Sequence, residues 1–163
     1  MRQLWAPWRG EYVGKEQPPG CILCEKPRAL DDATNYIVAR GQFVFALLNL
    51  YPYNNGHVML APYRHVGEME ELVPEEWTEF SLFLPRLIRA LKLSHRPHGF
   101  NIGLNLGRVA GAGIPGHLHW HVVPRWEGDT NFMPVVGETR VLPESLETTL
   151  AKLRAAWEQT AAT

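Results

Sequence analysis

The sequence predicts an α+β fold: an antiparallel sheet of about five strands, one long helix packed on it, and a C-terminal helix. Three observations lead to this prediction. Several short apolar runs are bounded by turn-forming residues. One long central segment has apolar residues at spacings of three and four, and a second such segment lies near the C-terminus. Strands clustered around one long helix are typical of antiparallel sheets.

Five segments have the composition of strands. Each is rich in β-branched, aromatic or other apolar residues and is bounded by turn-forming residues. A Gly41-Gln42 turn joins the first two, and a loop rich in Asn and Pro leads into the third. The expected strands are 35–40, 43–49, 57–62, 99–105 and 117–125.

Two segments have the periodicity of helices. In 74–92, Pro74 suits the first helical position, and the acidic residues that follow it favour the helix N-terminus. Pro85 lies inside this segment and is expected to kink or split the helix. The segment 143–157 places leucines and Trp157 on one face, so we expect a second helix there.

Composition indicates one globular domain spanning 1–163, with 1–20 as an irregular N-terminal arm. The chain is 45% hydrophobic and 20% charged, which suits a single buried core. The 16 basic and 17 acidic side chains give a net charge of −1, so we expect no binding to long nucleic acid. We expect no membrane-spanning helix, no signal peptide and no disulfide framework, and therefore a cytoplasmic location.

The most informative segment carries three alternating histidines, His117, His119 and His121. Alternate side chains of a strand share a face, so these imidazoles point one way, and Trp120 and its apolar neighbours point into the core. The outer pair would lie about 13 Å apart along the strand, too far to share one zinc ion without a bulge. The spacing therefore favours divided roles over a three-histidine metal site. The alternative is a row of surface histidines.

A glycine-rich loop, 107–116, precedes the histidines. It lacks the Lys-Ser/Thr ending of a Walker P-loop. Glycines let backbone N–H groups approach an anion closely, and Arg108 adds a cation. Beside three histidines the loop indicates phosphate chemistry, although a flexible connection between strands would have the same composition.

At these residues the chain resembles the histidine triad (HIT) superfamily, whose signature alternates His with apolar residues, as 117–123 does. The resemblance extends over most of the chain, including the turn into the third strand at 55–58. Within the superfamily the chain resembles bacterial diadenosine tetraphosphate phosphorylases more than the small nucleoside phosphoramidase branch. The segments that carry this finer resemblance are 4–9, 99–105 and 124–132.

The resemblance implies a site for nucleotidyl transfer. His119 would attack the α-phosphorus and form a nucleotidyl-histidine intermediate, and His121 would contact the phosphate. The loop glycines Gly107, Gly113 and Gly116 would supply N–H donors to the transition-state oxygens.

The same resemblance assigns ribose binding to Asn49 and places His57 in the histidine cluster. The alternatives are that Asn49 is a turn residue and that His57 is a strand-edge residue bonded to backbone.

The chain departs from the family at one position. Relatives often have Ser or Gln three or four residues before the triad, where it assists the leaving group. Here Gly113 and Ile114 have no side-chain donor. Leaving-group stabilisation would then fall to backbone amides, Arg108 or Asn105.

Cys21 and Cys24 form a Cys-x-x-Cys pair, which offers half of a tetrahedral metal site. A thioredoxin-like redox pair or two packed free thiols are the alternatives. Zinc-bearing relatives complete such a site with two histidines, and the resemblance assigns these to His65 and His117. The implied cofactor is structural zinc, which would fix the N-terminal arm to the sheet.

The resemblance thus implies an enzyme that cleaves diadenosine tetraphosphate with inorganic phosphate to ADP and ATP, acting as a homodimer. Hydrolysis with water, nucleoside phosphoramidase activity and a non-catalytic nucleotide- or zinc-binding module are the alternatives. Of the remaining residues, we expect His95 and His98 to be solvated. Trp5, Trp8 and Trp126 are expected to cover a nucleobase or a subunit interface.

Overall fold

The computed structural model describes residues 20–131, 133–137 and 141–162. Within them lies a five-stranded antiparallel sheet with the strand order β1-β2-β3-β5-β4. This confirms the predicted fold class. The strands are β1 (Ile37–Arg40), β2 (Val44–Leu48), β3 (Val58–Pro62), β4 (Gly99–Leu104) and β5 (Trp120–Arg125).

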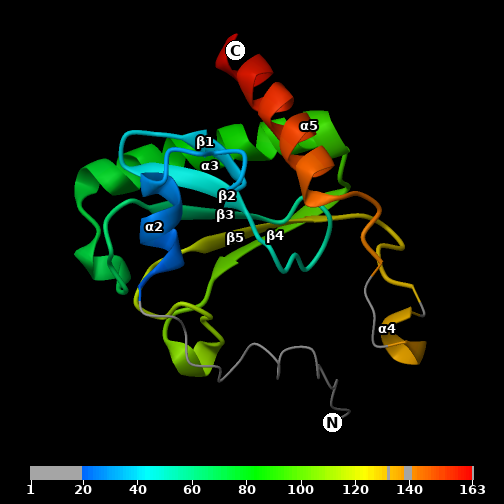
Figure 1. The fold of residues 1–163 in the computed structure, drawn as a ribbon, viewed down its shortest axis with the longest axis horizontal. Helices are drawn as coiled ribbons and strands as arrows, with labels where there is room; N and C mark the ends of the chain where they lie inside the picture. Colours follow the sequence, from blue (N-terminus) through cyan, green and yellow to red (C-terminus); the bar gives the residue numbers. More distant parts are fainter. Residues whose placement is uncertain (1–19, 132, 138–140, 163) are drawn as a thin grey trace.

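Helices cover both faces of the sheet (Figure 1). The long helix α3 and the C-terminal helix α5 pack together on one face, and α2 crosses the other. No helix among the described residues has the length and apolar character needed to cross a membrane. The helices are α2 (Ile22–Arg28), α3 (Pro74–His95), α4 (Met133–Val136) and α5 (Leu146–Gln159), with 3-10 turns η1 (Met69–Glu71), η2 (Arg108–Ala110) and η3 (Thr160–Ala162).

The two faces of the sheet contribute to separate apolar clusters. Leu118, Trp120 and Val122 join the larger cluster, which α3 and α5 complete. Met59 pairs with His121 across β3 and β5 and belongs to the smaller cluster on the α2 face. Because cross-strand partners share a face, His121 points away from the main core. The alternation predicted for this segment, with Trp120 in the core, is therefore confirmed.

Helix α3 continues through Pro85, so the predicted split does not occur. Proline removes one hydrogen bond, to the carbonyl four residues earlier, which here belongs to Ser81. Both residues are exposed, so water can hydrate that carbonyl. The buried side of the helix, which includes Leu87 and Leu91, stays packed against the core.

Several elements differ from the sequence prediction, and α4 as well as α2 lies where no helix was expected. The last strand begins at Trp120 rather than at His117, although Leu118 N still donates to Val66 O at 2.7 Å. Helix α2 was not predicted, because seven residues that include Pro27 show little periodicity. Of the predicted arm, residues 1–19 lie outside the described part of the chain, and Trp5 and Trp8 with them.

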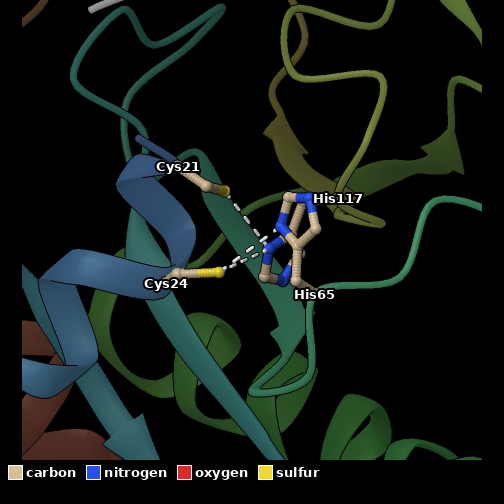
Figure 2. A group of neighbouring side chains, drawn as sticks. All are labelled: Cys21, Cys24, His65 and His117. Carbon is tan, nitrogen blue, oxygen red and sulfur yellow. Dashed lines mark hydrogen bonds between the residues drawn. The ribbon is translucent and has the colours of Figure 1, made fainter. Parts of the chain in front are cut away.

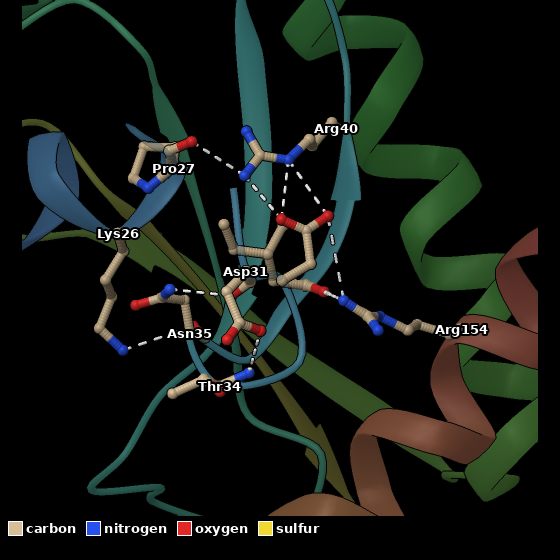
Figure 3. Close-up of polar contacts among 9 residues, drawn as sticks. Lys26, Pro27, Asp31, Thr34, Asn35, Arg40 and Arg154 are labelled. Carbon is tan, nitrogen blue, oxygen red and sulfur yellow. Dashed lines mark hydrogen bonds and ion pairs between the residues drawn. The ribbon is translucent and has the colours of Figure 1, made fainter. Parts of the chain in front are cut away.

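Two arginines tie the helices to the start of the sheet (Figure 3). Arg40 forms a two-pronged ion pair with Asp32 at 2.6–3.1 Å and donates to Pro27 O in α2 at 2.9 Å. From α5, Arg154 donates to Ile37 O at 2.6 and 3.0 Å. These contacts hold α2, and with it the two cysteines, against β1.

Candidate active site and metal centre

The two cysteines and two of the histidines converge on one point (Figure 2). Cys21 is the residue that precedes α2 and Cys24 lies in the first turn of that helix, while His65 follows β3 and His117 precedes β5. Their four candidate ligand atoms lie within 4.8 Å of one another. His117 Nδ1 is 3.3 Å from Cys21 Sγ and 3.5 Å from Cys24 Sγ, and Cys24 Sγ is 3.4 Å from His65 Nδ1. These residues could bind a metal ion.

The orientation of His117 suits a metal ligand. Its Nε2 lies 2.9 Å from Pro62 O, and a carbonyl can only accept, so Nε2 carries the hydrogen. The lone pair is therefore on Nδ1, which faces the sulfurs. Burial lowers the pKa of His117 to about 4, which keeps the ring neutral. A neutral imidazole whose second nitrogen donates to a carbonyl is the usual form of a metal-bound histidine.

The sulfurs also fit a cation. Neither cysteine is in a disulfide. Burial, and then the neighbouring Cys21, raise the pKa of the Cys24 thiol. A redox-active pair requires the opposite shift, because its attacking group is a thiolate. A divalent ion between the sulfurs would favour the thiolates and reverse the effect.

His119 is buried, with 4% of its surface exposed. Its Nδ1 lies 2.8 Å from the carbonyl oxygen of His117, so Nδ1 carries the hydrogen and Nε2 carries the lone pair. Burial lowers the pKa of His119, and the ring is therefore neutral near pH 7. A neutral imidazole with a fixed lone pair is chemically able to act as a nucleophile.

His57 and His121 form a second hydrogen-bonded pair. Tyr53 N donates to His57 Nδ1 at 3.0 Å, so the hydrogen of neutral His57 is on Nε2. That Nε2 lies 2.9 Å from His121 Nδ1, which must accept. Neutral His121 then carries its hydrogen on Nε2. The centroids of the His119 and His121 rings are 5.2 Å apart, so a lone pair on one ring and a donor on the other are neighbours.

The structure thus divides the three alternating histidines between two groups. The ring of His117 lies with the cysteines, while His119 and His121 lie with His57. The Tyr53 amide and the Pro62 carbonyl, which fix the tautomers, were missed by sequence reasoning, because a backbone group has no signature in the residue types.

The predicted nucleotide-binding residues lie around the β2–β3 and β4–β5 connections. Asn49 follows β2, and its Oδ1 accepts from Tyr51 N at 2.9 Å, as in a turn residue. Asn105 follows β4, and its Nδ2 contacts Gly111 O at 3.4 Å. In the loop, Gly107 has a φ of +75°, a conformation that favours glycine.

The other loop residues differ in exposure. Arg108 and Gly116 are exposed, and Gly113 is half-buried. A Cβ added to Gly116 would lie 3.4 Å from His65 Nε2, so the end of the loop approaches the candidate metal centre.

The expectation for His95 is wrong. Its side chain is only 2% exposed, and its Nε2 lies 3.8 Å from Glu144 Oε2. Burial lowers the pKa of His95. The prediction was wrong because the segment before α5, which is distant in sequence, covers the His95 side chain at the end of α3. His98 is exposed as expected, and half-buried Trp126 donates from Nε1 to Arg96 O at 3.2 Å.

Comparison with known proteins gives a consistent result. The chain is 45% identical over 166 residues to an AP-4-A phosphorylase of Mycobacterium tuberculosis, covering 96% of this chain and 85% of that protein. Two solved structures are similar in fold. A hypothetical histidine triad nucleotide-binding protein of Sulfolobus tokodaii has a TM-score of 0.68 and 25% identity, over 85% of this chain and 93% of that one. A zinc-bound histidine triad family protein of Mycobacterium smegmatis has a TM-score of 0.64 and 26% identity, over 78% and 86%.

The HIT domain family itself matches residues 32–128, which hold β1 to β5 and every histidine of the two groups. That match covers more than half of the chain and agrees with the geometry of the site and with the sequence resemblance. The chain belongs to the HIT domain family.

Proposed function

We propose that this protein is an enzyme that cleaves dinucleoside polyphosphates by nucleotidyl transfer through His119, with inorganic phosphate as the acceptor. The observation that carries the proposal is the buried, neutral ring of His119, whose Nδ1 is held by the His117 carbonyl at 2.8 Å. The similarity to an AP-4-A phosphorylase supports the choice of substrate and acceptor.

The reaction has two steps. His119 Nε2 attacks the α-phosphorus of diadenosine tetraphosphate, the bond from that phosphorus to the bridging oxygen breaks, and ATP leaves. The adenylyl group remains on His119. A phosphate oxygen then attacks the same phosphorus, the bond to Nε2 breaks, and ADP is formed. His121, with its hydrogen on Nε2, donates a hydrogen bond to the leaving oxygen in the first step, which stabilises the negative charge that develops there.

The remaining predicted residues bind the substrate. Backbone amides of Gly107, Gly113 and Gly116 bind the oxygens on which charge develops, and Arg108 adds its positive charge. Asn49 holds the ribose hydroxyls. His57 orients His121, and Asn105 assists the leaving phosphate, because Gly113 and Ile114 offer no side-chain donor.

Zinc is the ion that we propose for Cys21, Cys24, His65 and His117. Two thiolates and two imidazoles are a donor set that zinc prefers. When bound, the ion supplies a cross-link between α2 and the segment before β5. The thiols need a reducing compartment, so we propose a cytoplasmic location, with 1–163 acting as one domain.

We also propose a homodimer that uses the open edge of β4. This strand lies at the end of the sheet and pairs only with β5 among the described strands. Ile102 is 44% exposed, and a Cβ added to Gly99 or Gly103 would meet nothing within 4 Å. An apolar edge strand with room beside it is suited to pairing with another chain.

Product analysis tests the proposed reaction. Diadenosine tetraphosphate is incubated with the protein, with and without phosphate, and the nucleotides are separated. We expect ADP and ATP in equal amounts, formed only with phosphate. AMP and ATP would show that water is the acceptor and would contradict phosphorolysis.

We expect His119→Ala to abolish turnover and retain nucleotide binding, while exposed His98→Ala serves as the matched control. Full turnover in His119→Ala would refute the nucleophile.

A further inference from the structure

The segment 124–129, part of the pattern in which the sequence resembles the phosphorylases, contains a carboxylate that accepts hydrogen bonds from three residues. Asp129 accepts from Arg125 Nε at 2.6 Å and Nη2 at 3.0 Å, from Trp126 N at 3.2 Å and from Asn54 Nδ2 at 2.9 Å. Arg125 also donates to Asn101 Oδ1 in β4 at 2.7 Å. These donors lower the pKa of Asp129 to about 2, so it is ionised at any working pH. Asp129 is thus a charged acceptor anchored to the end of the sheet.

Asn54 connects this carboxylate to the turn that precedes β3. Both hydrogens of its side-chain amide are used, one by Asp129 and one by Pro124 O at 3.1 Å. The backbone oxygen of Asn54 accepts from His57 N at 3.2 Å and closes the turn 53–57. Gly56 has a φ of +71°, and a Cβ there would lie 3.4 Å from the Pro124 ring, so the turn fits closely against β5.

This turn presents the amide that sets the tautomer of the histidine pair. Tyr53 N donates to His57 Nδ1, and the Tyr53 ring lies 4.6 Å from the His57 ring and 5.6 Å from the His121 ring. The two neutral tautomers of histidine differ little in intrinsic stability, so the surrounding hydrogen bonds decide between them. If the turn moves, His57 is no longer required to donate from Nε2, and His121 is no longer required to hold its hydrogen on Nε2.

We propose that Asn54 and Asp129 are positioning residues for His121: they hold the turn 53–57 so that the Tyr53 amide fixes the tautomer of His57, and through it that of His121. The catalytic consequence rests on the proposed function, in which His121 Nε2 donates to the leaving group. The structural part concerns ring protonation alone and can be measured without a nucleotide.

The test uses the full-length protein labelled with ¹⁵N at histidine. Long-range ¹H–¹⁵N spectra distinguish rings that carry the hydrogen on Nδ1 from rings that carry it on Nε2. We expect Nε2–H for His57 and His121 in the unaltered protein. In Asn54→Ala we expect both rings to show averaged nitrogen shifts, kcat to fall about tenfold, and KM to change less than twofold. Asp32→Ala is the matched control. It breaks a different arginine–aspartate ion pair, the one with Arg40 in β1, and is expected to leave both rings unchanged.

The outcomes separate the two proposals. Unaltered shifts of both rings in folded Asn54→Ala would overturn the positioning role, whatever the activity. Shifted rings in a protein that never cleaves diadenosine tetraphosphate would support the positioning role and refute the proposed function. If Asn54→Ala does not fold, Asp129→Asn decides, because it retains one carbonyl oxygen for Arg125 and weakens the same contact to Asn54. We expect a smaller shift in the same rings, and its absence would overturn the proposal.

Discussion

The Nδ1 of His119 lies 2.8 Å from the carbonyl oxygen of His117, whose own ring faces the sulfurs of Cys21 and Cys24. One residue therefore contributes its side chain to the candidate metal centre and its backbone to the candidate nucleophile. Any change that moves the His117 backbone also moves the group that fixes the His119 tautomer. The two sites are adjacent in sequence and mechanically coupled.

Metal removal should therefore lower both stability and activity. We expect about one zinc ion per chain. At a free zinc concentration about 1,000 times the Kd, binding would stabilise the fold by about 4 kcal/mol. Chelation should lower Tm, and both thiols should then react with a thiol reagent. Cys24→Ser should reproduce the loss of Tm, since a hydroxyl is a poor zinc ligand. A protein that contains no zinc and whose thiols react immediately in the native state would contradict the metal site.

The pH dependence of the reaction should reflect the burial of His119. The nucleophile must be neutral, and burial lowers its pKa below the usual value of about 6.5. We therefore expect the adenylylation rate to persist as the pH falls through 6.5 and to decline only at lower pH. Rapid-quench measurement of the first turnover between about pH 4.5 and about pH 8 tests this, because that interval spans the pH range in which histidines ordinarily titrate. A decline centred above 6.5 would contradict a buried nucleophile.

The same shift should affect stability, and its sign follows from proton binding. The unfolded chain takes up a proton at His119 near pH 6.5, whereas the folded chain does so only at lower pH. The free energy of unfolding should therefore decrease as the pH falls below 6.5. Urea denaturation at several pH values measures the slope. His119→Ala removes this titrating group and should reduce the slope.

Glu79 should contribute strongly to stability although it lies far in sequence from its partners. Its carboxylate accepts from the backbone amides of Gln42, Phe43 and Val44 at 2.5–2.7 Å, capping the turn between β1 and β2. Glu79→Ala would leave three donors without this acceptor, and we expect a loss of about 2 kcal/mol in urea denaturation.

A second substitution checks the same contact from the other side. A Cβ on Gly41 would lie 2.6 Å from Glu79 Oε1, so Gly41→Ala should displace the carboxylate and cause a similar loss. Exposed Glu127→Ala is the control and should cost less than about 0.5 kcal/mol. Equal stabilities of Glu79→Ala and this control would contradict the capping role.

The dimer proposal predicts a change of molecular mass. Ile102→Lys places a charge on the open edge of β4, which opposes pairing with a second chain. We expect the unaltered protein to have twice the chain mass by light scattering and the variant to have the mass of one chain. Leu82→Lys, at a residue 70% exposed on α3, is the control. Equal masses for the unaltered protein and Ile102→Lys would contradict the use of this edge.

Much of the site could be predicted because strand alternation is a local property. Extended backbone places alternate side chains on one face, so His117, His119 and His121 share a face. This holds even though only His121 of the three lies in the hydrogen-bonded strand. The core position of Trp120 follows from the same rule. The four residues of the metal cluster also converge as the family resemblance implied.

The remaining features depend on contacts that residue types do not encode. His95 is buried because a segment almost fifty residues later covers it. Helix α3 continues through Pro85 because that residue faces water. The tautomers of His57 and His121 depend on the Tyr53 amide, and every residue except proline has an amide. Long-range coverage and backbone donors become visible only in three dimensions.

The separation of the two apolar clusters has a consequence for how this protein could diversify. Leu118, Trp120 and Val122 belong to the cluster beneath α3 and α5, whereas His121 faces the α2 side together with Met59. Substitutions of His121 therefore change the chemistry without entering the larger cluster. The smaller cluster and the four candidate metal ligands also lie on the α2 side, so a laboratory library should vary the polar residues around His121 and keep those residues fixed.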